Sequence, residues 1–243
     1  MLIADAVKRK EKHETNRTNI LNFLLLHRYS SLKNIAYELK HKSSATSSRI
    51  LKKLCYEGLV RKETLQDEHT KVVLFGITKK GIDATDNFID DHQPFQKGSV
   101  SLRTINHTLV NQRVMSAYSR RFKGSEVVNT EFGNLKKYEK IIKFNHRPDG
   151  VIFYKIDDRL EAIILETELS LKDRKRYWKI WYEYVQGIKE SKVFAVAYVM
   201  KNEAAVKRIE TIFNKLKYDL CRNREEITKL EERFFFSSQE DIL

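Results

Sequence analysis

Three carboxylates lie at the ends of two neighbouring segments between residues 148 and 168. Asp149 opens a segment rich in β-branched and aromatic residues, and Glu166 and Glu168 close the next one, after a polar turn at residues 157–159. This pattern predicts two antiparallel strands, so the start of the first should lie beside the end of the second. Side chains two positions apart in a strand point to the same face. The sequence therefore predicts that the three carboxylates converge.

Converging carboxylates repel one another unless a cation lies between them. Mg²⁺ and Mn²⁺ take oxygen ligands of this kind, which makes a divalent metal site the first hypothesis. A bound metal lowers the pKa of its water and offsets charge on a phosphate, so the chemistry expected here is phosphodiester cleavage. The alternative is that these residues are solvated acids at strand ends, as in many sheets.

Composition indicates a globular protein with a polyanionic partner. The 243 residues carry a net charge of +13, and the pI is near 9.5. The charge is concentrated, because seven basic residues between Lys40 and Lys62 accompany the single acid Glu57. Cys55 and Cys221 are far apart and favour reduced thiols. We expect a cytoplasmic protein, since no apolar run is long enough to span a bilayer and the N-terminus lacks the apolar core of a signal peptide.

Residues 1–89 show the order of a winged helix-turn-helix. Residues 1–14 are expected to form a frayed or extended arm. Apolar spacing and polar caps predict helices from Asn16, after the caps Ser30-Ser31 and after Ser43 or Ser44, and two strands at 59–65 and 70–78 follow as the wing. A short helix at 79–88 is expected to end this domain.

The third of these helices enters the major groove in such a fold. Short polar and basic side chains suit phosphates and base edges. With one lysine from the wing, the candidate DNA contacts are Ser44, Thr46, Ser47, Ser48, Arg49, Lys52, Lys53 and Lys71. The alternative is a winged helix used for protein contacts, against which the basic excess on this helix argues.

Residues 90–103 are the expected linker, because they are polar and contain Pro94 and Gly98. From Thr104 onwards the pattern predicts an α/β domain of residues 104–243. Its elements are a helix, a strand at 125–132, the hairpin, a helix at 172–190, an apolar strand at 192–200, a helix after Asn202 and a strand at 232–237. The stretch at 133–146 is basic and irregular. A near-continuous apolar strand is typical of one covered on both faces, and the order predicts a mixed sheet.

The hairpin also resembles the core of PD-(D/E)XK nucleases. The resemblance rests on Pro148-Asp149, a strand, a turn, a strand and Glu166-x-Glu168, with Glu168 where the family usually has lysine. It implies a restriction-endonuclease-like fold for residues 104–243. It also implies a lysine displaced to the following helix, for which Lys172 and Lys179 are the candidates.

A winged helix followed by this core resembles the replication-relaxation family, and within it the MobC-type relaxases of mobilisable plasmids, over nearly the whole chain. The segments flanking the wing also resemble bacterial MarR-like regulators. The local signs of the family are His107 with Asn111, Glu131, Pro148-Asp149, Glu166-x-Glu168, and Lys179 followed by Tyr182 and Tyr184. Family members often have Glu-x-Asp where this chain has Glu-x-Glu. The resemblance implies a metal-dependent, strand-specific nick in double-stranded DNA at an origin of transfer or replication. A conjugation coupling protein and a homodimer are the implied partners.

In this scheme Asp149 and Glu166 hold one or two Mg²⁺ or Mn²⁺ ions. Glu168 is a further ligand or orients the attacking water, and Glu131 supports the metal. Lys172 or Lys179 stabilises the charge on the phosphate. His107 could equally be a buried, hydrogen-bonded histidine, and Glu131 a plain strand-end acid.

A tyrosine nucleophile is the other chemistry to weigh. Neutral tyrosine has a pKa of about 10 and is a weak nucleophile, so we expect hydrolysis without a lasting covalent adduct. Trp178, Trp181 and Val185 are expected to form the core face of their helix, and Tyr184 to lie off that face. Tyr184 is therefore the nucleophile to expect if an adduct forms.

Two other functions fit the same pattern. One is a non-catalytic DNA-binding regulator of plasmid replication or transcription with an inactive nuclease-like core. The other is a transposition endonuclease, against which the order of the two domains counts.

Overall fold

The computed structural model describes residues 2–85, 92–132, 138, 142, 144–156 and 159–243. The chain divides into two compact units, Met1–Arg113 and Val114–Leu243. The division falls inside helix α5 (Ile105–Arg121). Part of the expected trailing helix at 79–88, of the linker at 90–103 and of the basic stretch at 133–146 lies outside the described residues.

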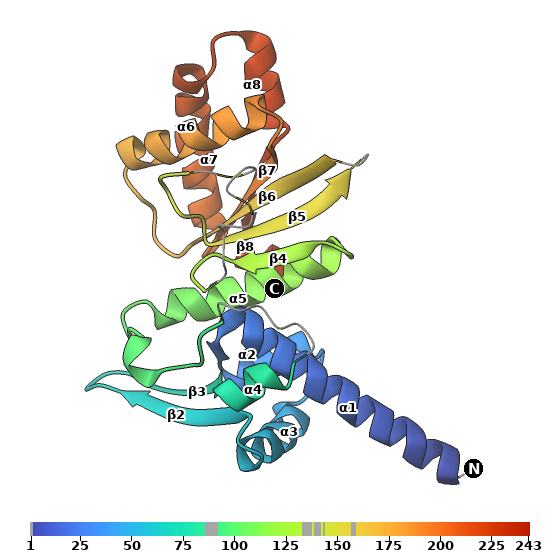
Figure 1. The fold of residues 1–243 in the computed structure, drawn as a ribbon. Helices are drawn as coiled ribbons and strands as arrows, with labels where there is room; N and C mark the ends of the chain where they lie inside the picture. The colour runs from blue at the N-terminus through green and yellow to red at the C-terminus, as the bar shows by residue number, and fades with distance from the viewer. Residues whose placement is uncertain (1, 86–91, 133–137, 139–141, 143, 157–158) are drawn as a thin grey trace. The chain divides into compact units, whose positions relative to one another are not determined.

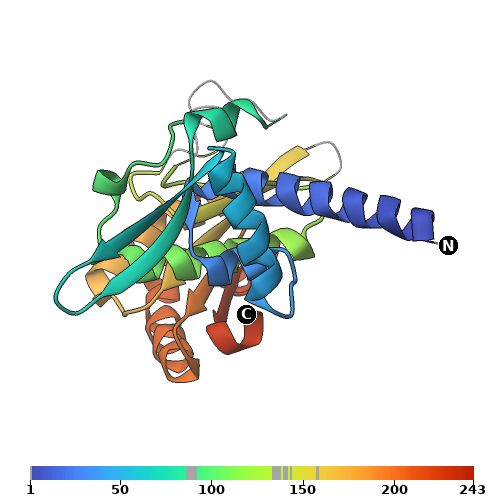
Figure 2. The same ribbon diagram turned by 90° about the horizontal axis from the view of Figure 1, so that it is seen from below.

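The first unit combines helices with a small antiparallel sheet in strand order β1-β3-β2 (Figures 1 and 2). Its elements are α1 (Leu2–His27), β1 (Tyr29–Ser30), α2 (Leu32–Glu38), α3 (Ser44–Tyr56), β2 (Val60–Gln66), β3 (Lys71–Ile77), α4 (Lys79–Asp83) and the 3₁₀ turn η1 (Lys97–Ser99). This is the predicted order of a winged helix. The core joins apolar residues of all three main helices to the sheet, among them Leu24, Ile35, Leu51 and Ile77.

The expectation of a frayed arm at residues 1–14 is wrong, because α1 begins at Leu2. This stretch contains no glycine or proline and is rich in alanine, lysine and glutamate, which favour the helix. From residue 6 to residue 14 the side chains are mostly exposed, and the apolar periodicity that predicts a helix starts only where α1 reaches the core, near Ile20. A helix without a buried face has no apolar periodicity, so its sequence pattern does not predict it.

The second unit is built on a five-stranded sheet in the order β4-β5-β6-β7-β8. Strands β4 to β6 form an antiparallel meander, whereas β6, β7 and β8 are parallel. The bounds are β4 (Glu126–Asn129), β5 (Gly150–Ile156), β6 (Arg159–Glu168), α6 (Arg174–Lys189), β7 (Val193–Met200), α7 (Glu203–Leu220), α8 (Arg224–Glu231), β8 (Phe234–Ser238) and α9 (Gln239–Ile242). The mixed-sheet α/β class and the nuclease-like element order are as expected. Helices α8 and α9 were not predicted.

Parallel neighbours require crossover connections, and helices supply them here. Helix α6 connects β6 to β7, and α7 with α8 connects β7 to β8 (Figure 1). Residues from one face of the sheet form a single core with the inner faces of α6 and α7, in which Trp181 donates its indole N–H to the hydroxyl of Tyr198 at 3.0 Å. This packing fixes α6 above the ends of the hairpin strands.

No helix among the described residues is both long and apolar enough to cross a membrane.

Candidate active site and nucleic-acid interface

The hairpin register places Asp149 next to Glu166. Gly150 lies opposite Leu165 in the β5–β6 pairing, so the residue before β5 lies beside the residue after Leu165. The backbone N–H of Thr167 donates to Asp149 Oδ2 at 2.8 Å, which holds the carboxylate at this edge of the sheet. Glu166 and Glu168 are 2% and 6% exposed, and both contact tyrosines of α6. The structure thus brings the three predicted carboxylates together at one end of the strands, where β5 begins and β6 ends.

Glu166 is the most deeply buried of these acids. Its Oε1 lies 2.8 Å from Nε2 of His146 and accepts the hydroxyl hydrogen of Tyr184. Burial raises the pKa of Glu166, and the negative charge of Asp149 adds to the rise, while the bonds from His146 and Tyr184 oppose it without cancelling it. The ionised form of Glu166 is therefore unfavourable in the folded protein, and a cation beside it would relieve this cost.

Glu168 is neutralised by a lysine. Its Oε2 forms an ion pair with the ammonium group of Lys172 and accepts the hydroxyl hydrogen of Tyr177 at 3.1 Å. The backbone N–H of Lys172 donates in turn to the Tyr177 hydroxyl at 3.2 Å. Asp173 caps α6, so Lys172 lies just outside the helix and folds back on Glu168. Lys179 is exposed, about 200° round α6 from Tyr177. Of the two lysine candidates, the structure brings Lys172 to the carboxylates.

The expectation that Tyr184 lies off the core face of α6 is wrong. Three residues of helix amount to about 300°, which places Tyr184 only about 60° from Trp181, and its exposure is 0%. Trp178, expected in the core, is 37% exposed. Burial raises the pKa of Tyr184 well above its ordinary value, and the charge of Glu166 raises it further. Tyr184 therefore has the chemistry of a hydrogen-bond donor to Glu166, and a tyrosinate nucleophile is unfavourable here.

Glu131 lies beyond the end of β4, and His107 lies in α5. Strand β4 ends at Asn129, opposite Gly150, so Glu131 lies in the exposed turn that follows and not at a strand end as expected. His107 is half-buried in the part of α5 that belongs to the first unit.

Three residues of the site were not predicted. His146 contacts Glu166, Tyr177 contacts Glu168, and Glu183 accepts from the backbone N–H groups of Asn145 and His146 at 2.6 and 3.3 Å. Glu183 thereby ties the segment before Pro148 to α6. A histidine three positions before Asp149 was a usable signal, whereas nothing in the spacing of Glu183 marks it.

The residues fit a metal site of two carboxylates more closely than one of three or four. Among the described residues, no group of three His, Cys, Asp or Glu side chains is arranged to hold a metal ion. Glu168 is occupied by Lys172, while Asp149 and Glu166 remain adjacent. Mg²⁺ is often bound by one or two carboxylates together with substrate phosphates, and this pair matches that requirement.

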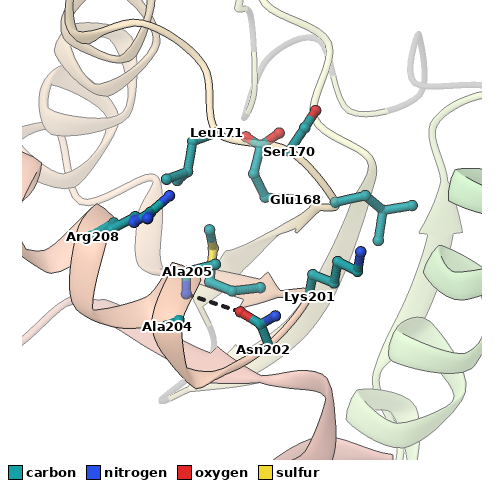
Figure 3. A pocket seen from close by; sticks show the side chains of 10 residues that line it. Glu168, Ser170, Leu171, Lys201, Asn202, Ala204, Ala205 and Arg208 are labelled. Atoms are coloured by element: carbon teal, nitrogen blue, oxygen red, sulfur yellow. Dashed lines mark hydrogen bonds between the residues drawn. The ribbon is translucent and has the colours of Figure 1, made fainter.

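A pocket of about 300 Å³ adjoins Glu168 where β6 and β7 end (Figure 3). Its cationic lining residues are Lys201 and Arg208, and Asn202 caps α7 at its edge by accepting from the backbone N–H of Ala205 at 3.0 Å. Ligands of open α/β sheets bind beyond the carboxyl ends of the strands. The pocket therefore offers room and positive charge for a phosphate group beside Glu168, whereas Asp149 and Glu166 do not line it.

The first unit carries the candidate DNA contacts. Ser44, Thr46, Arg49, Lys52, Lys53 and Lys71 are exposed, and Ser48 is half-buried. Ser47 is wrongly predicted as a DNA contact, because it is 0% exposed and its hydroxyl lies 2.8 Å from Nδ1 of His41. Tyr56 is 93% exposed at the end of α3 and was not predicted. Lys71 begins β3, and the remaining candidates form a basic, polar face on α3 suited to a DNA backbone.

Arg49→Ala and Lys52→Ala should each weaken duplex binding and reduce its salt dependence by about one unit of slope for each lost phosphate contact. The measurement is the dissociation constant of a labelled duplex at several salt concentrations. Lys229→Ala, on the exposed side of α8, is the control and should leave the slope unchanged. Unchanged slopes in both α3 variants would move the DNA surface elsewhere, with residues 136–143 as the alternative, most of which lie outside the described residues.

No protein-family model matches the chain, and comparison with curated proteins also finds no match. Two solved structures of the restriction endonuclease FokI, one of them bound to DNA, align with TM-scores of 0.29 and 0.27 at 12% identity. The alignments cover 92% and 94% of this chain but 48% and 43% of the FokI chains. The chain thus spans less than half the length of those proteins, and a similarity this low establishes no residue correspondence.

Proposed function

We propose that this protein is a metal-dependent DNA endonuclease, in which α3 binds duplex DNA and the carboxylates of the second unit cleave it. The proposal is carried by the convergence of Asp149, Glu166 and the Glu168–Lys172 pair at one edge of a mixed sheet. Adjacent carboxylates next to a lysine are the groups that metal-assisted phosphodiester cleavage needs.

Asp149 and Glu166 would hold one or two Mg²⁺ or Mn²⁺ ions, which supply a Lewis acid and a bound water of lowered pKa. His146 and Tyr184 orient the Glu166 carboxylate through Oε1, which leaves Oε2 as the atom for a further ligand. Glu168 fixes the position of the Lys172 ammonium group. That charge can stabilise negative charge as it develops on the phosphate.

Within this class we propose a plasmid-mobilisation relaxase that nicks one strand at an origin of transfer. Support comes from a winged helix ahead of a nuclease-like core, and from the local motifs that resemble the replication-relaxation family. A coupling protein of a conjugation system and a second copy of the chain are the proposed partners.

A non-catalytic DNA-binding regulator is the second candidate. It is favoured by the ion pair that joins Glu168 to Lys172, and by the lack of a three-residue metal group among the described side chains. In that case the carboxylates would serve the packing of α6 on the sheet, and no divalent ion would be needed for function.

A nicking assay decides between the endonuclease and the regulator. Supercoiled plasmid carrying the cognate origin is incubated with the protein and Mg²⁺ or Mn²⁺. The endonuclease should convert it to open circles, and EDTA should prevent the conversion. Duplex binding without any conversion in either metal would support the regulator. Conversion that persists in Asp149→Asn would contradict cleavage at the proposed site.

Tyr184→Phe should keep nicking within about tenfold of wild type and leave no protein attached to the nicked strand. The phenol donates a hydrogen bond to Glu166, so its loss affects the carboxylate without removing a nucleophile. Denaturing gels of end-labelled DNA, run with and without protease, test this, with exposed Tyr182→Phe as the matched control. A protein-retarded label that vanishes only in Tyr184→Phe would show covalent catalysis.

A further inference from the structure

Helix α6 exposes an aromatic stack on the face opposite the core. Trp178 and Tyr182 are 37% and 46% exposed, and their rings are stacked with centroids 5.4 Å apart at 21°. The inner face of the same helix already supplies aromatic packing through Tyr177 and Trp181, both 0% exposed. The outer pair is therefore additional to the core.

Two lysines flank this stack. Lys175 and Lys179 are exposed and lie three or four positions from the aromatic residues, which puts all four side chains on one stripe of the helix. Within the described part of the chain neither lysine forms an ion pair. The nearby acid Glu183 is engaged with the backbone of residues 145 and 146. The outer stripe of α6, defined as Lys175, Trp178, Lys179 and Tyr182, is thus aromatic and positively charged.

We propose that the outer stripe of α6 binds a single-stranded nucleic acid. Unpaired bases stack on exposed aromatic rings whatever their sequence, and lysines between the rings complement the phosphates. A duplex hides its base faces and could use only the lysines. A protein helix or a lipid chain would need aliphatic contacts, and the stripe has none.

The surface belongs to the helix whose other face holds Tyr177 and Tyr184 against Glu168 and Glu166. A nucleic-acid strand bound there would lie across α6 from the carboxylates of β6. The binding itself requires neither a metal nor cleavage, so it stands independently of the proposed endonuclease activity.

Tryptophan fluorescence of the full chain tests the proposal, because the protein has only two tryptophans and Trp181 is buried. Oligo(dT) and oligo(U) of about 20 nucleotides should quench the emission in a saturable way, whereas a matched duplex should not. Trp178→Phe should lose the quenching but keep most of the affinity, measured by anisotropy of a labelled oligonucleotide. Tighter binding of oligo(dT) assigns the strand to DNA, and tighter binding of oligo(U) to RNA.

Trp178→Ala and Tyr182→Ala should each weaken binding of the preferred oligonucleotide by about tenfold or more. Thermal unfolding should show that these exposed changes leave the fold intact. Tyr218→Ala removes a 64% exposed tyrosine of α7 and should have no effect. Asp149→Asn should also bind normally, which separates this surface from cleavage. Wild-type affinity in Trp178→Ala, or equal quenching by the duplex, would overturn the proposal.

Discussion

Asp149→Asn and Glu166→Gln should each reduce DNA nicking by at least about a hundredfold while leaving duplex binding within about twofold. These two carboxylates are adjacent at the sheet edge, and each change removes a charge with little change in shape. The α3 residues proposed to bind the duplex belong to the other unit, so binding should survive. Parallel nicking and mobility-shift assays measure both properties. A parallel loss of binding and folding would identify the carboxylates as structural.

The pKa of Glu166 provides an independent check that Glu166→Gln is folded. Burial raises this pKa above the ordinary value of 4.5, so the unfolded chain ionises at lower pH than the folded protein. The stability that this carboxyl contributes therefore falls as the pH rises from about 4.5 through the raised pKa, and stays low above it. Glutamine carries no charge. Urea unfolding at pH 7 should consequently show Glu166→Gln to be at least as stable as wild type.

Lys172→Met should reduce nicking by on the order of a hundredfold, because its ammonium group is the cation paired with Glu168 at the site. Lys172→Arg keeps the charge and should recover part of the rate. Single-turnover measurements at saturating protein isolate this step from DNA binding. Under those conditions Lys179→Met should stay within about threefold of wild type, since Lys179 lies on the exposed side of α6. A large loss in Lys179→Met and none in Lys172→Met would exchange the two roles.

The convergence of Asp149, Glu166 and Glu168 could be predicted because it follows from local rules. A tight turn fixes the hairpin register, and alternation in a strand puts residues two apart on one face. Which lysine joins them could not be predicted, because Lys172 and Lys179 both follow the glutamates along the chain. The choice depends on where α6 begins, and the Asp173 cap sets that point one residue after Lys172.

The contacts of Glu183 were beyond prediction for a different reason. They join an irregular segment to α6 across 37 and 38 residues, and no periodic pattern encodes the path of such a segment. The burial of Tyr184 could be predicted, since helical spacing alone places it beside Trp181. The polar first half of α1 was missed because helix propensity without a buried face leaves no periodic signal.

Calorimetric titration of the 243-residue chain with Mn²⁺ tests the central claim without knowledge of the DNA target. We expect saturable binding to wild type, and binding at least about tenfold weaker in both Asp149→Asn and Glu166→Gln, because each loses one carboxylate of the pair. Equal Mn²⁺ binding by all three proteins, or none by wild type even with a DNA oligonucleotide present, would contradict a metal site at Asp149 and Glu166.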